Sequence, residues 1–192
     1  KILLVGAELQ SKALDKTSRG RNISVLFGDG AGAFVLGQTS GEGARIISSD
    51  LHTEGKFAKE LWLAAPGSSL GPERLTKDMI DEGLHYPYMN GKAVFVNAVK
   101  RMSETVKTSL DIAKMSTEEI DLYFFHQANM RINQKVADYL SLKDHQVHNT
   151  VQKYGNTTAA TIPLGFKDAM DAGKISRGQK IVFAAFGSGF TW

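Results

Sequence analysis

The sequence predicts an α/β protein whose largely parallel sheet is covered by helices. Short apolar runs at residues 2–5, 122–125 and 180–186 have the composition of sheet strands, and segments with helical periodicity separate them. Strands that alternate with helices are typical of this class. With 192 residues, of which 42% are hydrophobic and 22% charged, the chain can bury a substantial core.

The composition excludes several classes of function. The chain has no cysteine, which excludes disulfides, thiolate metal sites and any thiol nucleophile carried on this chain. The net charge is only +3 and no long block of like charge occurs, so nucleic-acid binding has little support. There is no apolar run long enough for a membrane span and no basic-then-apolar leader, so a cytoplasmic protein is expected.

The first strand is followed by a glycine-rich block. Residues 2–5 are continuously apolar, as in a strand buried on both faces of a parallel sheet. Gly28, Gly30 and Ala33 fit the spacing of a dinucleotide-binding fingerprint, but that motif has to open a helix, whereas 34–37 has the character of a strand. We therefore expect a tight turn whose small residues allow close backbone packing.

The middle of the chain predicts a short strand, an irregular segment and a helix. The strand is expected at 44–51, and 52–90 follows without periodicity but with three of the four prolines, as in many lids and interfaces. Asn90 is a candidate N-cap. The helix after it has an apolar stripe formed by Val94, Phe95, Ala98, Val99, Met102, Val106 and Leu110.

His126 follows the central strand directly and precedes another helix. Apolar residues at 132, 136 and 140 form one face of that helix, so His126 is expected at the carboxyl edge of the sheet, near a positive helix end. Ligand sites gather at this edge. A single histidine is also compatible with a purely structural role in the core or on the surface.

Two more polar clusters follow at expected sheet edges. A modest strand at 145–151 would point His145 and His148 to opposite faces, which argues against a shared metal. Asn156 lies in a run of small residues, and the nearby Pro163 conflicts with a helix that Gly173 would end. The last strand leads into Gly187, Ser188 and Gly189, a turn whose backbone amides could face a ligand.

A histidine, an amide side chain and a glycine-rich turn together suggest proton handling and stabilisation of an oxyanion. Four blocks in one order carry a resemblance to a known family. They are FGDGAGA at 27–33, HQANMRI at 126–132, YGNTTAA at 154–160 and FGSGFTW at 186–192. With these blocks the chain resembles the β-ketoacyl-acyl-carrier-protein synthase III family of the thiolase superfamily.

The resemblance implies a thiolase-like fold and a condensing enzyme that initiates fatty-acid synthesis. In such enzymes a cysteine takes an acyl group from acyl-CoA, and malonyl-acyl-carrier-protein loses CO2 to form the attacking enolate. The resemblance assigns His126 and Asn156 as the catalytic pair that holds the enolate oxygen, as two neutral donors. It assigns Gly187, Ser188 and Gly189 to the second oxyanion hole, with serine where many members have glycine. No cofactor is implied; acyl-CoA is a substrate, and a homodimer is expected.

The family's substrate-binding positions map onto further residues. Arg21 matches a residue that contacts CoA, and Phe95, Ala128 and Asn129 match the lining of the pantetheine tunnel. Arg131 matches the carrier-protein docking face, which Lys100, Lys107 and Lys135 could extend, although a solvated helix face is the plainer interpretation of helix lysines. Lys92 falls where some members have asparagine.

The most serious departure from the family pattern is that the family's nucleophilic cysteine is absent. We expect a piece of a larger protein, with residues 1–40 ending the amino-terminal thiolase-like half and 41–192 forming the carboxyl-terminal half with its last strand truncated. Two alternatives stay open. The parent could be a sibling condensing enzyme with another extender, or the chain could be a non-catalytic partner subunit.

Overall fold

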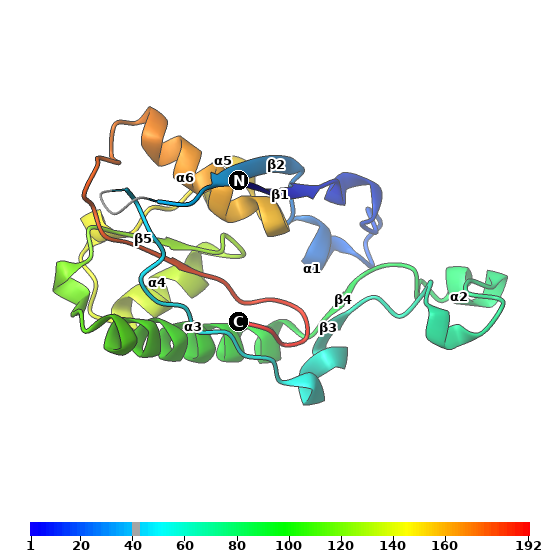
Figure 1. The fold of residues 1–192 in the computed structure, drawn as a ribbon. Helices are drawn as coiled ribbons and strands as arrows, with labels where there is room; N and C mark the ends of the chain where they lie inside the picture. The colour runs from blue at the N-terminus through cyan, green and yellow to red at the C-terminus, as the bar shows by residue number, and fades with distance from the viewer. Residues whose placement is uncertain (40–42) are drawn as a thin grey trace.

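The computed structural model describes residues 1–39 and 43–192, and it confirms the α/β class. The predicted boundary between residues 40 and 41 lies outside the described residues. Strands β5 (Leu122–Phe125) and β6 (Ile181–Ala184) pair in parallel, between helices α3 and α4 on one face and α6 on the other (Figure 1). Within the described part of the chain, no helix is both long and apolar enough to cross a membrane.

The amino-terminal strand differs from its prediction. β1 (Ile2–Glu8) pairs antiparallel with β2 (Gly30–Leu36), and its residues 2–5 each expose more than half of their surface. A continuous apolar run indicates the potential for burial but not the direction of the strand. In the described part of the chain, η6 (Thr158–Ala160) and α6 (Thr161–Asp171) pack against this ladder.

The glycine-rich block is also different from the expected turn. Gly30 and Gly32 lie inside β2 itself. The expected close packing is nevertheless present, because a Cβ atom at Gly28 would lie 2.2 Å from the Tyr154 carbonyl oxygen and one at Gly32 would lie 2.8 Å from Pro163. The glycines thus allow β2 and the turn before it to lie directly on the segment that carries Asn156.

The segment at 44–51 forms no strand, contrary to expectation. Its large apolar side chains are exposed and no neighbouring strand offers a ladder, so composition alone was misleading. It is tied instead to α3 (Gly91–Ala113), where the Thr105 hydroxyl donates to an Asp50 carboxylate oxygen at 2.6 Å.

Residues 52–90 contain short elements that reach away from the sheet (Figure 1). β3 (Leu61–Trp62) and β4 (Tyr88–Met89) pair antiparallel, and α2 (Lys77–Asp81) lies farther out. Thr53 forms a bridge to Thr191, which joins the start of this segment to the turn after β6. Other short helices in the described residues are η1 (Gln10–Lys12), α1 (Arg21–Ser24), η2 (Gly55–Glu60), η3 (Ser68–Leu70) and η4 (Thr117–Glu119).

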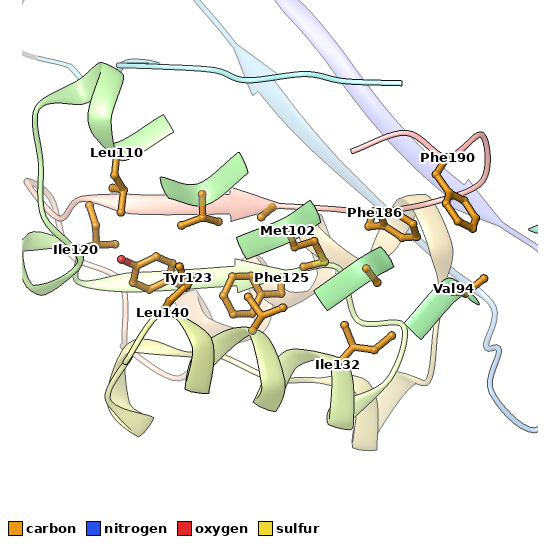
Figure 2. Packing of buried hydrophobic residues seen from close by; sticks show 14 residues of the cluster. Val94, Met102, Leu110, Ile120, Tyr123, Phe125, Ile132, Leu140, Phe186 and Phe190 are labelled. Carbon is orange, nitrogen blue, oxygen red and sulfur yellow. The ribbon is translucent and has the colours of Figure 1, made fainter. Parts of the chain in front are cut away.

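The main core lies between the β5–β6 ladder and the pair α3 and α4 (Met130–Tyr139) (Figure 2). Because side chains alternate along a strand, Tyr123 and Phe125 face this core, whereas Leu122 and Phe124 belong to the smaller cluster under α6. The predicted helical stripe is confirmed, and Asn90 caps α3 by accepting from the Ala93 amide at 3.2 Å.

The segment after α4 contains helical turns where a strand was expected at 145–151. η5 (Asp144–Gln146) and α5 (Val151–Tyr154) occupy it, and only Val147 bridges to Tyr123. The Gln146 side chain donates to the Ile120 carbonyl at 2.7 Å and to that of Thr117, and such bonds compete with a ladder.

The conflict at Pro163 is resolved by its position in α6. Pro163 is the third residue of the helix, where the backbone N–H would have no partner within the helix, so proline costs little. Gly173 ends α6 as predicted: it has φ of +68°, and its N–H donates to the Met170 carbonyl while that of Lys174 donates to Ala169.

Candidate active site

His126 extends the parallel ladder by one residue beyond β5. Its backbone N–H donates to the Ala184 carbonyl at 2.8 Å, so the residue is held at the carboxyl end of both strands. Asn129 then caps α4 through its side chain, which accepts from the Arg131 amide at 2.8 Å. The predicted strand-to-helix junction is confirmed, and His126 lies where α/β proteins build their ligand sites.

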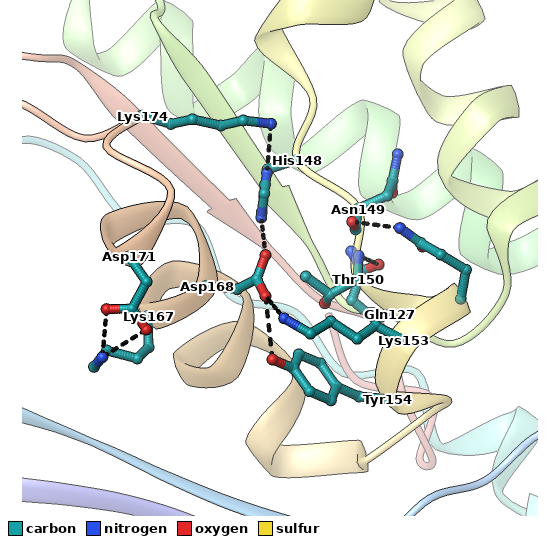
Figure 3. A network of polar contacts seen from close by, with 11 residues as sticks. Gln127, His148, Asn149, Thr150, Lys153, Tyr154, Lys167, Asp168, Asp171 and Lys174 are labelled. Atoms are coloured by element: carbon teal, nitrogen blue, oxygen red, sulfur yellow. Dashed lines mark hydrogen bonds and ion pairs between the residues drawn. The ribbon is translucent and has the colours of Figure 1, made fainter.

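Gln127 fastens this junction to the segment that leads to Asn156 (Figure 3). Its side chain is 2% exposed, and its carbonyl oxygen accepts from the amides of Thr150 at 2.8 Å and Val151 at 3.0 Å. Its amide nitrogen donates to the Phe125 carbonyl at 2.8 Å. A buried side chain with three such bonds is a firm clamp, because breaking any of them would leave a buried polar group unpaired.

Asn156 is buried and held by its backbone between two residues before β2. Its N–H donates to the Leu26 carbonyl at 2.9 Å, and its own carbonyl accepts from Gly28 at 2.9 Å. The side-chain oxygen accepts from the Thr158 amide, also at 2.9 Å. The side-chain nitrogen has no hydrogen-bond partner among the described residues, so this donor is available to a ligand.

A chain of hydrogen bonds connects His126 to Asn156. His126 Nδ1 lies 2.7 Å from Thr161 Oγ1, and the Thr161 hydroxyl donates to the Thr158 carbonyl at 2.9 Å. The N–H of the same Thr158 donates to Asn156 Oδ1. Thr158 serves both neighbours from a backbone with φ of +45°, an unusual conformation for a β-branched residue and one often found at functional sites.

Burial determines the protonation state of His126. Because little water reaches the ring, burial lowers the pKa of His126 from 6.5 to about 4. The imidazole is therefore neutral near pH 7, and Nε2 has no hydrogen-bond partner among the described residues. The site thus presents one ring nitrogen and one amide nitrogen for external partners.

The turn at 187–189 follows β6, the strand that holds His126 in place. The Gly187 N–H is already used, since it donates to the Thr191 carbonyl at 2.9 Å. The N–H groups of Ser188 and Gly189 have no backbone partner in the described residues, so they are the available donors of the turn. The Ser188 hydroxyl donates to the Leu61 carbonyl at 2.6 Å and thereby ties the turn to β3.

The structure brings two of the predicted tunnel and docking residues together. The Arg131 guanidinium lies 5.7 Å from the centre of the Phe95 ring, and both Phe95 and Ala128 pack partly buried against the main core. Asn129 is occupied as the cap of α4. Arg131 itself is exposed at the first turn of that helix.

The basic residues farther from His126 differ in whether they have a charged or aromatic partner. Arg21 begins α1, is exposed and has no ion-pair partner in the described chain, whereas the nearby Arg19 is bound to Asp15 at 2.7 Å. No hydrogen bond between Arg21 and His126 is present among the described residues. Of the lysines considered for docking, Lys92 is exposed; Lys100 pairs with Glu104, Lys135 with Asp138, and Lys107 lies over the Tyr139 ring.

Two neighbours of the site, Thr158 and Thr161, were not found from the sequence, and the hydrogen bonds of Gln127 were not predicted. The Gln127 side chain can both donate and accept hydrogen bonds. Its position next to His126 was the signal in the sequence that it could help to hold the site. Thr158 and Thr161 gave no signal, because a hydroxyl's partner depends on backbone geometry. Among the described residues no three potential metal ligands cluster together, and His148 contacts Asp168 while His145 is exposed.

The fold and the arrangement of these residues define the class of protein as thiolase-like. The solved 3-oxoacyl-acyl-carrier-protein synthase III of Aquifex aeolicus superposes with a TM-score of 0.85 at 34% identity, over 99% of this chain and 55% of that one. Family models agree: 3-oxoacyl-acyl-carrier-protein synthase III matches residues 1–55, and its C-terminal model matches residues 110–192. The chain belongs to the 3-oxoacyl-acyl-carrier-protein synthase III family.

Curated relatives give the same result over the whole chain. The β-ketoacyl-acyl-carrier-protein synthase III of Aliivibrio fischeri is 40% identical over 191 residues, which are 100% of this chain and 56% of that protein. The enzyme of the same name from Bacillus pumilus is also 40% identical over 191 residues, and the match covers 54% of it. The chain therefore spans little more than half the length of these relatives.

Proposed function

We propose that this chain carries the decarboxylation site of an enzyme that joins an acyl group from acyl-CoA to malonyl-acyl-carrier-protein with loss of CO2, the step that initiates fatty-acid synthesis. The observation that carries the proposal is the connection of His126 to Asn156 through Thr161 and Thr158. In this arrangement His126 Nε2 and Asn156 Nδ2 have no hydrogen-bond partner among the residues that the structure describes. The names of the relatives at 40% identity support the same chemistry.

The residues present suffice for one half of this reaction. When a malonyl thioester loses CO2, the electron pair of the broken C–C bond becomes an enolate, and negative charge develops on the thioester oxygen. Preorganised polar groups at that oxygen lower the barrier, and each is typically worth about 10²–10³ in rate. A proton from solvent then converts the enolate into an acetyl thioester, so this half needs no nucleophile from the protein.

The acyl-transfer half needs a group that this chain does not contain. The sequence has no cysteine, so a cysteine-linked acyl group would have to be carried on residues outside this sequence. In that half, the N–H groups of Ser188 and Gly189 are proposed to hold the acyl oxygen. The serine side chain matters little for such a backbone donor, and its bond to Leu61 helps to fix the turn.

Substrate binding is assigned to three regions. Arg21 is proposed for the phosphates of CoA, because it is exposed and lacks an ion-pair partner in the described chain. Phe95, Ala128 and Asn129 are proposed to line the pantetheine path beside the site. Arg131, with positive charge at the first turn of α4, is proposed as the main contact for an acidic carrier protein.

The proposal is tested by CO2 release from malonyl-acyl-carrier-protein with this chain. His126→Ala and Asn156→Asp are each expected to lower the rate by about 10²–10³-fold. Asn156→Asp is the sharper variant, since it keeps an oxygen for the Thr158 amide but removes the nitrogen donor. The exposed His145→Ala serves as control and should keep the full rate. A wild-type chain that releases no CO2, or variants equal to it, would overturn the assignment.

The remaining expectations form part of the same proposal. They are a homodimer, a cytoplasmic location, no cofactor beyond acyl-CoA as substrate, and division into halves at 1–40 and 41–192. A wild-type chain that binds the carrier protein but never decarboxylates its malonyl group would instead favour the non-catalytic partner subunit. Release of CO2 only from malonyl-CoA, and not from the carrier-protein thioester, would favour a sibling enzyme.

A further inference from the structure

The bonds around Thr161 determine which nitrogen of His126 carries a proton. Thr161 Oγ1 lies 2.7 Å from His126 Nδ1 and 2.9 Å from the carbonyl oxygen of Thr158, and the threonine is only 3% exposed. A hydroxyl has a single proton to donate, and a carbonyl oxygen can only accept. The hydroxyl proton is therefore committed to Thr158.

The contact with the ring has to be satisfied in the opposite direction. Since its proton points to Thr158, Thr161 Oγ1 can only accept from His126, and Nδ1 must carry the hydrogen. In a neutral ring this leaves Nε2 with a free lone pair, and Nε2 has no hydrogen-bond partner among the described residues. No other protein group among the described residues competes for either ring nitrogen.

We propose that Thr161 is a positioning residue that holds His126 as the Nδ1–H tautomer, so that the resting site offers a ligand one acceptor, Nε2, and one donor, Asn156 Nδ2. This differs from the expectation of two neutral donors. In the Nδ1–H tautomer, His126 can hold an enolate oxygen through Nε2 only after Nε2 has taken up a second proton from solvent. The resulting imidazolium forms a charge-assisted bond, which is about twice as strong as a neutral one.

The inference deepens the proposed function and rests on it only for its consequence in the reaction. The tautomer is a property of the resting protein and is observable without turnover. The two proposals can therefore fail separately. If only the decarboxylation proposal is wrong, CO2 release is absent while His126 still carries its proton on Nδ1.

The test is ¹⁵N nuclear magnetic resonance of the imidazole side chains in the 192-residue chain at pH 7. The wild-type His126 should show a protonated Nδ1 and an unprotonated Nε2. Thr161→Val removes the acceptor and should shift most of the population to Nε2–H, the form preferred by a free imidazole. Thr161→Ser keeps the hydroxyl and should restore the wild-type pattern, which a merely structural role for the threonine methyl would not do.

Thr105→Val is the matched control. It removes a similarly buried hydroxyl with a short bond, to Asp50 at 2.6 Å, and should leave the His126 signals unchanged. A wild-type protein with Nε2–H overturns the inference, and this measurement needs no variant to fold. A Thr161→Val protein that folds and keeps Nδ1–H also overturns it, as does a Thr161→Ser protein that resembles the valine variant.

Discussion

His126 illustrates how the environment of one residue sets its chemistry. The ring ends a fully buried strand, contacts one hydroxyl and has no charged partner, so desolvation alone accounts for the lowering of its pKa to about 4. The neutral form is favoured in the folded protein. This preference is coupled to folding and therefore appears as a dependence of stability on pH.

We predict that His126 lowers stability in mild acid. Between pH 6.5 and about 4 the unfolded chain binds a proton at this position that the folded protein does not, so the free energy of unfolding decreases as the pH falls through this window. The full effect of this shift is about 3 kcal/mol. Above pH 6.5 the contribution disappears.

The measurement is urea unfolding between pH 4 and 7.5 for the wild type and for His126→Gln. The glutamine variant should show a flatter pH dependence, because it cannot bind the proton in the unfolded state. His145→Gln changes an exposed histidine and should retain the wild-type slope. Identical slopes for wild type and His126→Gln would contradict a neutral imidazole in the folded protein.

The family resemblance assigned His126 and Asn156 as a pair, and the structure connects them by hydrogen bonds through Thr161 and Thr158. Their role in catalysis stays a prediction. Thr158 and Thr161 could not be predicted, because their roles depend on a positive φ and on a 3₁₀ turn that brings a carbonyl beneath a hydroxyl. The type of a residue shows which hydrogen bonds its side chain can form, but the path of the backbone determines which partner it bonds.

At the scale of elements, Asp168 joins α6 to the segment that precedes the site (Figure 3). Its carboxylate accepts from Tyr154 at 3.1 Å, lies 3.1 Å from His148 Nε2 and pairs with Lys153. The bond from Lys153, with those from Tyr154 and His148, lowers the pKa of Asp168. The carboxylate is thus ionised and holds three groups of the α5 region against α6.

We predict that Asp168→Ala lowers the free energy of unfolding by about 2–3 kcal/mol, because it leaves the buried His148 and the Tyr154 hydroxyl without their partner. Asp171→Ala, one turn further along α6, removes only an exposed pair with Lys167 and should cost under about 0.5 kcal/mol. Chemical denaturation of both variants provides the comparison. Equal losses would mean that Asp168 is an ordinary surface acid.

Helices and strands were predicted correctly where a clear pattern of apolar residues faces one core. The predictions failed where a strand would need a partner strand from a distant part of the sequence. The helix after Asn90 and the strand at 122–125 were correct, since each presents a repeated pattern to one core. The strands expected at 44–51 and 145–151 were wrong, because a short apolar or β-branched run forms a strand only beside a neighbour, which the local sequence does not specify.

At the scale of the whole molecule, the α/β class and the order of the clusters were predictable, but strand direction at the amino terminus was not. β1 was expected in a parallel sheet and is antiparallel to β2. The exposed apolar side chains of β1 explain the misinterpretation, because apolar composition was taken as evidence for burial in a parallel sheet. The binding of a carrier protein at Arg131, as proposed above, also concerns the molecule as a whole.

We predict that Arg131→Glu raises the KM for malonyl-acyl-carrier-protein by about tenfold, since charge reversal turns an attraction to an acidic partner into a repulsion. The difference from wild type should shrink as salt is added, because screening weakens contacts between exposed charges. Decarboxylation of a malonyl thioester on a short pantetheine analogue should be unaffected, because that substrate brings no carrier protein.

Arg177→Glu is the charge-matched control. Arg177 is exposed in the turn before β6, at the opposite end of the sheet from His126, and has no ion-pair partner in the described chain. Its reversal should leave the KM within twofold of wild type, an allowance that corresponds to about 0.4 kcal/mol. Equal effects at both positions would show that net charge, and not a docking surface, governs binding.

The closeness of the glycine block to the Asn156 segment has a consequence for anyone who surveys the protein by random mutagenesis. A single methyl group at Gly28 would lie 2.2 Å from the Tyr154 carbonyl oxygen and 3.6 Å from Thr157, and would have to displace the backbone two residues from Asn156. Such a survey would therefore score Gly28 as essential and tempt the experimenter to assign it to a nucleotide or a substrate. Gly28 matters because it has no side chain. The backbone at Tyr154 can therefore pack closely against it, and the Asn156 amide stays in position.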